Sequence, residues 1–78
     1  MRSSFEIIAE ILETAKDGAK KTRIMYAGGL SYRFVQKYLD LLIETELLAM
    51  GSSYKTTEKG MAFLHKYQKL ELLMTTRH

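Results

Sequence analysis

The segment around residue 35 carries three polar side chains, Arg33, Gln36 and Lys37, within five consecutive residues. Arginine and lysine hydrogen-bond to guanine and to phosphate, whereas glutamine pairs with adenine through one acceptor and one donor. A helical surface with these residue types is suited to contact nucleic acid. The same composition also occurs on helix surfaces that only face solvent, so this interpretation depends on the surrounding charge and on the fold.

The surrounding charge favours the nucleic-acid interpretation. The net charge of the 78-residue chain is +3 at pH 7, but the charges are unevenly distributed. The segment from Gly18 to Leu39 contains no acidic residue, whereas the segment from Glu6 to Asp17 has four carboxylates and a single lysine. The basic residues of the acid-free segment are Lys20, Lys21, Arg23, Arg33 and Lys37. We therefore expect a surface with separate basic and acidic regions.

The composition argues against several other classes of protein. The chain has no cysteine, and its two histidines, His65 and His78, are too far apart in sequence to suggest a zinc site. The sequence shows no nucleophile paired with a base, no phosphate-binding glycine loop and no metal-ligand spacing. It therefore predicts a protein that is not an enzyme and uses no cofactor, metal or small-molecule ligand.

The length and hydropathy favour a single domain outside the membrane. A chain of 78 residues has room for one domain. It has no run of about 18 apolar residues, the length that a membrane-spanning helix requires. Glu6 and Glu10 interrupt the apolar region that a signal peptide would need. We expect a cytoplasmic, nucleoid-associated protein that does not enter a membrane.

Capping residues and glycines predict the elements that position the basic residues. Ser3 and Glu6 have the spacing of a capping box, which starts a first helix that ends at Asp17-Gly18. Ser31 is a suitable N-cap for a third helix. The other expected elements are a short helix over 21–27, the third helix over 31–46, a hairpin with strands 47–50 and 54–56, and a last helix over 58–75.

Apolar residues at helical spacing are expected to form the core. In the first helix they are Phe5, Ile8, Ile11, Leu12 and Ala15, and in the third they are Phe34, Val35, Tyr38, Leu39 and Leu42. Tyr26 takes an inward position on the short helix and is expected in the core as well.

The order helix, helix, helix, hairpin, helix is that of a winged helix-turn-helix domain. We expect a mainly α (α+β) fold with three helices, a two-stranded wing and a long C-terminal helix. In this interpretation residues 1–56 form the DNA-binding part, and residues 57–78 form a C-terminal helix for dimerisation within one continuous domain.

Several short motifs resemble one family. They are residues 21–26 (KTRIMY), residues 30–32 (LSY), residues 37–39 (KYL) with Leu42, and Tyr54 with residues 57–60 (TEKG). Over nearly the whole chain, the sequence is similar to the archaeal winged-helix DNA-binding proteins of the Sulfolobus "ten-a" group. The resemblance implies a regulatory or chromatin-associated DNA-binding protein that forms a homodimer through an antiparallel coiled coil of its last helix.

The chain departs from this family pattern at three places. Glu46 stands where glycine is common, which bears on how the third helix ends. Thr56 stands where the wing usually has an apolar residue. The last helix is also shorter than in the best-known members, which leaves less helix for a coiled coil.

The predicted partner is double-stranded DNA, with the helix over 31–46 in the major groove. Asp40 and Glu44 would repel phosphate, so contact is expected to end at Lys37. Tyr32 is equally suited to contact DNA or to pack against the second helix, and the basic residues could instead serve solubility. The candidate DNA-binding residues are Lys20, Lys21, Arg23, Ser31, Tyr32, Arg33, Gln36, Lys37, Ser52, Ser53 and Lys55.

The last helix has an apolar stripe that is longer than a domain of this size can cover. Exposed apolar surface costs about 25 cal/mol per Å². We therefore expect a homodimer interface formed by Phe63, Tyr67, Leu70, Leu73 and Met74.

Two other functions fit the same residues. A winged helix can serve as a protein–protein interaction adaptor without direct DNA binding, and a basic amphipathic last helix could bind a membrane surface. The sequence also leaves open whether a DNA-binding protein of this type is a transcriptional regulator or a chromatin protein.

Overall fold

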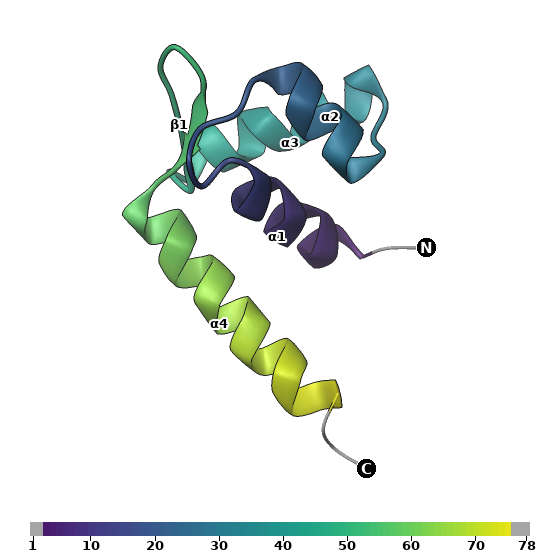
Figure 1. The fold of residues 1–78 in the computed structure, drawn as a ribbon, viewed down its shortest axis with the longest axis vertical. Coiled ribbons are helices and arrows are strands. Elements are labelled where there is room, and N and C mark those ends of the chain that lie inside the picture. Colours follow the sequence, from purple (N-terminus) through teal and green to yellow (C-terminus); the bar gives the residue numbers. More distant parts are fainter. Residues whose placement is uncertain (1–2, 76–78) are drawn as a thin grey trace.

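The computed structural model describes residues 3–75, so His78 and the end of the expected unit 57–78 lie outside the described residues. The elements are α1 (Ser4–Thr14), α2 (Lys21–Gly28), α3 (Tyr32–Glu44), β1 (Leu48–Met50), β2 (Tyr54–Thr56) and α4 (Glu58–Thr75). In Figure 1, α1, α2 and α3 pack together, the hairpin projects beside them, and α4 runs away from this group. The predicted order of elements and the mainly helical fold are confirmed.

The capping box predicted at the start of α1 is present. The backbone N–H of Ser3 donates to Oε1 of Glu6 at 2.8 Å, and the N–H of Glu6 donates to Oγ of Ser3 at 3.2 Å. The helix ends at Thr14, before the predicted end at Asp17-Gly18. This earlier end lets Ala19 form backbone hydrogen bonds with Tyr54 of β2, each 2.9 Å long.

The turn between α2 and α3 depends on Gly29 and Ser31. Gly29 has φ 61°, a left-handed conformation that glycine adopts without a steric penalty. Ser31 caps α3, because its Oγ accepts a hydrogen bond from the N–H of Phe34 at 3.3 Å. The second helix and the start of the third are therefore held at a tight turn, as the sequence predicts.

The third helix ends at Glu44, two residues before the predicted end at Glu46. The N–H of Leu47 donates to the carbonyl of Leu42 at 2.8 Å, and the N–H of Glu46 donates to the carbonyl of Ile43 at 3.0 Å. These two bonds form a Schellman motif, in which glycine usually takes the left-handed position. Here Glu46 takes it, with φ 65°.

The hairpin is antiparallel, with Leu48 paired to Thr56, Ala49 to Lys55 and Met50 to Tyr54. Thr56 is buried, and its hydroxyl donates to the carbonyl of Leu12 at 2.6 Å. A polar residue is therefore suited to this wing position, because it satisfies a carbonyl near the C-terminus of α1.

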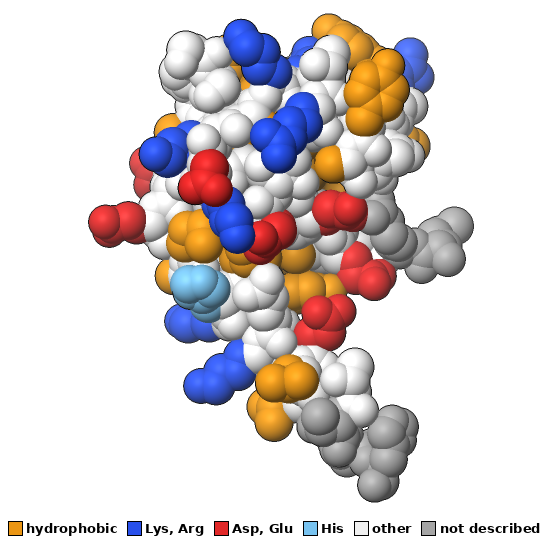
Figure 2. All heavy atoms as spheres, in the orientation of Figure 1, with side chains coloured by type: hydrophobic (Ala, Val, Ile, Leu, Met, Phe, Trp, Pro, Cys, Tyr) orange, Lys and Arg blue, Asp and Glu red, His pale blue; other side chains and the backbone are white. Residues whose placement is uncertain are grey.

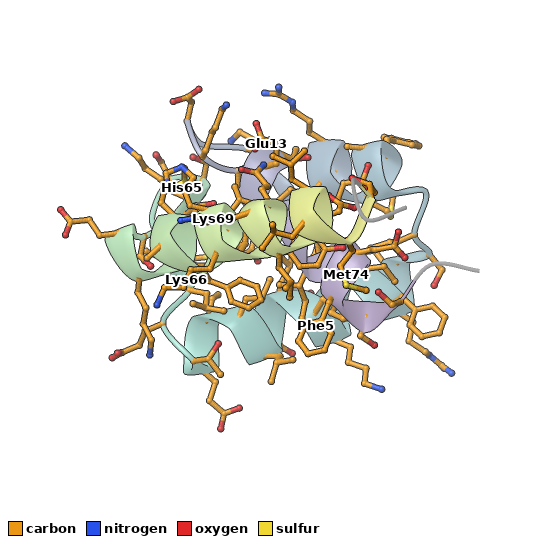
Figure 3. All side chains as sticks on the ribbon, turned by 90° about the horizontal axis from the view of Figure 1, so that it is seen from below. Phe5, Glu13, His65, Lys66, Lys69 and Met74 are labelled. Carbon is orange, nitrogen blue, oxygen red and sulfur yellow. The ribbon has the colours of Figure 1, made fainter. Side chains whose placement is uncertain are left out.

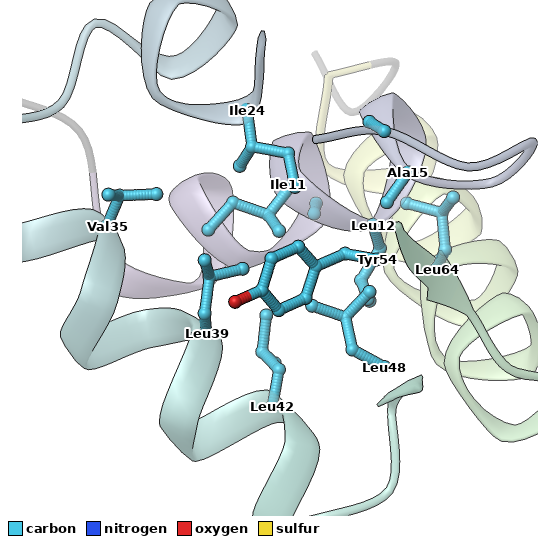
Figure 4. Close-up of a cluster of buried hydrophobic side chains, with 12 residues drawn as sticks. Ile11, Leu12, Ala15, Ile24, Val35, Leu39, Leu42, Leu48, Tyr54 and Leu64 are labelled. Carbon is cyan, nitrogen blue, oxygen red and sulfur yellow. The ribbon is translucent and has the colours of Figure 1, made fainter. Parts of the chain in front are cut away.

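The core lies between α1, α2, α3 and the hairpin. Its members are Ala9, Ile11, Leu12, Ala15, Ala19, Ile24, Val35, Leu39, Leu42, Leu48, Tyr54 and Leu64. Figure 4 shows the ring of Tyr54 between Ile11 on one side and Leu39 and Leu42 on the other.

The prediction that Phe5, Tyr26 and Phe34 belong to this core is wrong. Their exposed fractions are 61%, 79% and 56%. These rings lie next to buried positions in the sequence but face outward, and the core is formed instead by neighbours such as Val35 and by Tyr54 of the hairpin. Tyr38 is intermediate: it packs partly against the core, and its hydroxyl donates to Oγ of Ser4 at 3.2 Å.

The fourth helix packs against the core through its first half, where Phe63 and Tyr67 are partly buried against it. Thr57 receives a hydrogen bond from the N–H of Gly60 at 3.0 Å and donates one to the carbonyl of Glu46 at 2.7 Å. Gly60 and Leu64 are the buried residues of α4. Within the described part of the chain, no helix is long and apolar enough to cross a membrane.

Candidate nucleic-acid interface

The outer face of α3 gathers the largest group of predicted site residues. The inner face is fixed to the core by Val35, Leu39 and Leu42, which are buried. A shallow hollow on the outer face is lined by Tyr32, Arg33, Gln36, Lys37 and Asp40. Four of these five were predicted to contact DNA, whereas Asp40 was predicted only to repel it.

Asp40 hydrogen-bonds to one of the candidate base-reading residues. Nε2 of Gln36 donates to Oδ1 of Asp40 at 2.8 Å. The two residues are one helical turn apart, so this contact is a local i to i+4 pair. Sequence reasoning missed it, although the spacing of a glutamine and an aspartate four residues apart is a signal for it.

Tyr32 links the two helices of the helix-turn-helix. Nζ of Lys21, on α2, lies 3.0 Å from the hydroxyl of Tyr32 and 4.2 Å from the centre of its ring. The first is a hydrogen bond and the second is in the range of a cation–π contact. The exposed fraction of Tyr32 is 64%, so the side chain contacts α2 and also remains open to solvent. Both sequence interpretations of Tyr32 are compatible with this position.

The start of α2 adds further basic groups. Lys20 and Arg23 are exposed, and Lys20 is the N-cap residue of the helix. No side-chain hydrogen bond caps this helix. Its first N–H groups therefore lie without a side-chain cap in a basic segment, which is a favourable arrangement for an anion.

The tip of the hairpin is less strongly charged. Ser52 and Lys55 are exposed, whereas Ser53 is half-buried. Oγ of Ser53 lies 3.1 Å from the position that a Cβ would take on Gly18. None of these three residues lines the hollow on α3. The structure thus brings the α3 residues together and leaves the hairpin residues as a separate group.

Acidic side chains gather on a different surface, where α1 meets α4. A cleft of about 270 Å³ between these helices is lined by residues that include Glu6, Glu10, Glu13 and Glu71. Burial, followed by the charges of Glu71 and Glu6, raises the pKa of Tyr67 in this cleft above its ordinary value. Figure 2 shows acidic side chains across the middle of the visible face, with basic ones above them and further basic ones among and below them. The carboxylates of α1 are therefore gathered at its junction with α4, away from the hollow on α3.

An apolar groove lies beside α4. It has a volume of about 380 Å³ and is lined by Phe5, Phe63, Lys66, Tyr67 and Leu70. Figure 3 shows Phe5, from α1, next to α4. Sequence reasoning named three of these residues as dimer contacts but placed Phe5 in the core. Leu73 and Met74, also predicted as dimer contacts, are exposed farther along α4.

No group of three or more potential metal ligands occurs within residues 3–75. The arrangement on α3 can bind through hydrogen bonds and charge. The basic hollow suits an anionic partner, and the apolar groove suits another protein surface.

Comparison with known proteins gives matches over nearly the whole chain. A family model described as winged helix-turn-helix matches residues 1–75. The uncharacterized protein MJ0287 of Methanocaldococcus jannaschii is 37% identical, and the match covers 97% of this chain and 80% of that protein. A second uncharacterized protein of the same organism, MJ0290, is 34% identical over 88% of this chain, which spans only 34% of that protein.

One solved structure is also similar. It is the crystal structure of Sso10a-2, a DNA-binding protein from Sulfolobus solfataricus. The TM-score is 0.83 and the sequence identity is 27%, and the match covers 96% of this chain and 84% of that chain. The similarity therefore includes the three packed helices, the hairpin and α4.

Proposed function

This chain belongs to the winged helix-turn-helix family, and on that basis we propose that it binds double-stranded DNA as a transcriptional regulator or a chromatin-associated protein. The observation that carries the proposal is the hollow on α3, where Arg33, Gln36 and Lys37 lie together on a helix that the core holds in place. The similarity to a DNA-binding protein of known structure supports it.

In the proposed complex, α3 enters the major groove and its first two turns contact the bases. Arg33 and Lys37 are one turn apart on the exposed face, so both can reach base edges or phosphates. Lys20, Lys21 and Arg23 approach the phosphates next to the groove, where the start of α2 favours an anion. Ser52 and Lys55 of the hairpin are placed to contact the flanking backbone.

We further propose that two copies associate along α4. The groove beside Phe5 and Tyr67 exposes apolar surface, and Leu70 is 58% exposed at its edge. A second α4 packed antiparallel against this groove would cover its apolar surface and the exposed side chain of Leu70. A dimer would present two α3 helices to the DNA, and their separation would set the preferred spacing of half-sites.

The DNA proposal is tested by fluorescence anisotropy of a labelled random duplex between about 50 and 200 mM salt. Each phosphate contact adds about 0.9 to the slope of log K against log salt. We expect the double variant Arg33→Ala and Lys37→Ala to bind at least about tenfold more weakly, with a slope lower by up to about 1.8. The matched control is Lys16→Ala with Lys69→Ala, which removes the same charge at exposed residues outside the α3 hollow and the apolar groove and is expected to leave the slope unchanged.

Two results would overturn the proposal. The first is no binding of the wild-type protein even at the lowest salt concentration, which would favour an adaptor for an acidic protein partner. The second is equal weakening by the α3 variant and by the control variant at Lys16 and Lys69, which would indicate a response to net charge instead of a contact surface on α3.

A further inference from the structure

We propose that Asp40 is a positioning residue, which fixes the side-chain amide of Gln36 so that Gln36 reads adenine. This inference rests on the proposed binding of DNA by α3 and adds a base preference to it. The evidence is the 2.8 Å hydrogen bond from Nε2 of Gln36 to Oδ1 of Asp40.

The chemistry of this pair determines which way the amide points. A carboxylate only accepts hydrogen bonds, so the group of Gln36 that faces Asp40 must be the NH₂ group. The bond occupies one of the two N–H donors. The second N–H and the carbonyl oxygen Oε1 remain available on the rest of the amide.

The remaining groups match adenine better than guanine. In the major groove adenine presents an acceptor at N7 and a donor at N6, whereas guanine presents acceptors at both N7 and O6. An amide with one fixed N–H donor beside one fixed oxygen acceptor can pair with both groups of adenine. With guanine, the amide oxygen of Gln36 would face a second acceptor, N7 or O6. A 180° rotation of the amide would remove this repulsion, but it would break the hydrogen bond to Asp40.

The position of Asp40 also gives it a role that its charge alone does not suggest. It lines the same hollow as Arg33 and Lys37, on the face where a carboxylate would weaken contact with phosphate. Gln36 is half-buried beside it, so a defined orientation of the amide is retained at the surface of the helix. We infer that Asp40 lowers general DNA affinity and in return provides base selectivity.

The experiment compares variants by base preference and by affinity. Preferred duplexes are first selected from a random library with the wild-type protein, and each base pair of the best duplex is then exchanged in competition anisotropy. The variants are Gln36→Ala, Asp40→Ala and Asp40→Asn. The matched control is Glu44→Gln, which neutralises the carboxylate one turn farther along the same exposed line.

We expect the wild-type protein to prefer adenine at one position by at least about fivefold. Asp40→Ala and Gln36→Ala should both lose most of this preference at the same position, while Asp40→Ala binds random DNA a few-fold more tightly. Asp40→Asn can donate as well as accept, so it no longer fixes the amide and should lose part of the preference, whereas Glu44→Gln should retain it. Circular dichroism and thermal melting establish that each variant is folded.

The inference is overturned if Asp40→Ala keeps the wild-type preference, or if Glu44→Gln loses as much of it as Asp40→Ala. Binding of DNA without any adenine preference overturns the inference and leaves the proposed function in place. Absence of DNA binding by the wild-type protein overturns both, so the two failures are distinguishable.

Discussion

The two long helices, α3 and α4, are anchored in opposite ways. On α3, Val35, Leu39 and Leu42 are buried over successive turns. The outer face carries charged and polar side chains in its hollow, together with exposed apolar ones such as Phe34 and Leu41. On α4, the buried residues lie in the first half, and Met74 near its end is 64% exposed. One helix therefore presents a polar face from a fixed position, whereas the other extends an apolar face beyond the core.

This difference separates two kinds of binding surface. A polar face can stay in water until an anionic partner displaces that water, so α3 is complete in a single copy of the chain. An apolar face of several side chains is costly to leave in water and is typical of a contact between proteins. The comparison thus supports the proposal that α3 faces DNA and that α4 faces another protein.

The largest predicted effect follows from removing the apolar face of α4. We expect the wild-type protein to sediment at twice its chain mass of 9.0 kDa. Replacing Leu70 and Met74 by glutamine should raise the dissociation constant of the dimer at least about a thousandfold, since burying each such side chain contributes about 1.5 kcal/mol or more in each copy. Analytical ultracentrifugation across a concentration series measures the change.

The control for this experiment lies on α3. Leu41 is 44% exposed there, and Leu41→Gln should leave the sedimenting mass unchanged. A wild-type protein that stays monomeric at high concentration would contradict the assignment of α4. If the α3 and α4 variants weaken the dimer equally, the two helices do not differ in their contribution to dimerisation.

A second prediction concerns the start of α4, where it meets the rest of the fold. A Cβ on Gly60 would overlap the carbonyl oxygen of Leu47 and lie 2.7 Å from Cγ2 of Thr56. We expect Gly60→Ala to lower the free energy of unfolding by about 2–3 kcal/mol, because backbone must move to relieve the overlap. Urea denaturation at fixed protein concentration measures it.

Gly51→Ala is the matched control for Gly60. A Cβ at Gly51 meets no atom within 4 Å, so this substitution should change the free energy of unfolding by less than about 0.5 kcal/mol. If Gly60→Ala lowers the free energy of unfolding no more than Gly51→Ala does, the close approach of α4 to Leu47 and Thr56 does not require glycine at residue 60.

Local signals allowed much of the fold to be predicted from the sequence. Ser3 with Glu6, and Ser31, cap helices through hydrogen bonds to residues three positions away, and such contacts are visible in the sequence. Both strands were placed within one residue of their observed starts. The ends of α1 and α3 were placed too late, because their ends depend on Ala19 pairing with Tyr54 and on the conformation of Glu46.

Four of the five residues that line the hollow on α3 were named from the sequence, and the features that were missed depend on tertiary contacts. Apolar spacing gives the same signal for Phe34, which is exposed, as for Val35, which is buried. Which of the two faces the core depends on how α3 packs against residues of other elements in the core cluster. The constraint at Gly60 depends in the same way on Leu47 and Thr56, so the sequence alone gave no reason to single it out.

The smallest predicted effect concerns the end of α3, where Glu46 has φ 65°. A side chain costs about 1 kcal/mol in this conformation, and glycine avoids most of that cost. We expect Glu46→Gly to raise the free energy of unfolding by up to about 1 kcal/mol, which raises Tm by a few degrees. Glu44→Gly removes the same charge from the last helical residue and should lower stability by about 0.5–1 kcal/mol. Thermal melting at fixed protein concentration compares the Tm of the two variants with that of the wild-type protein. If both substitutions shift Tm in the same direction, the backbone of Glu46 is not strained.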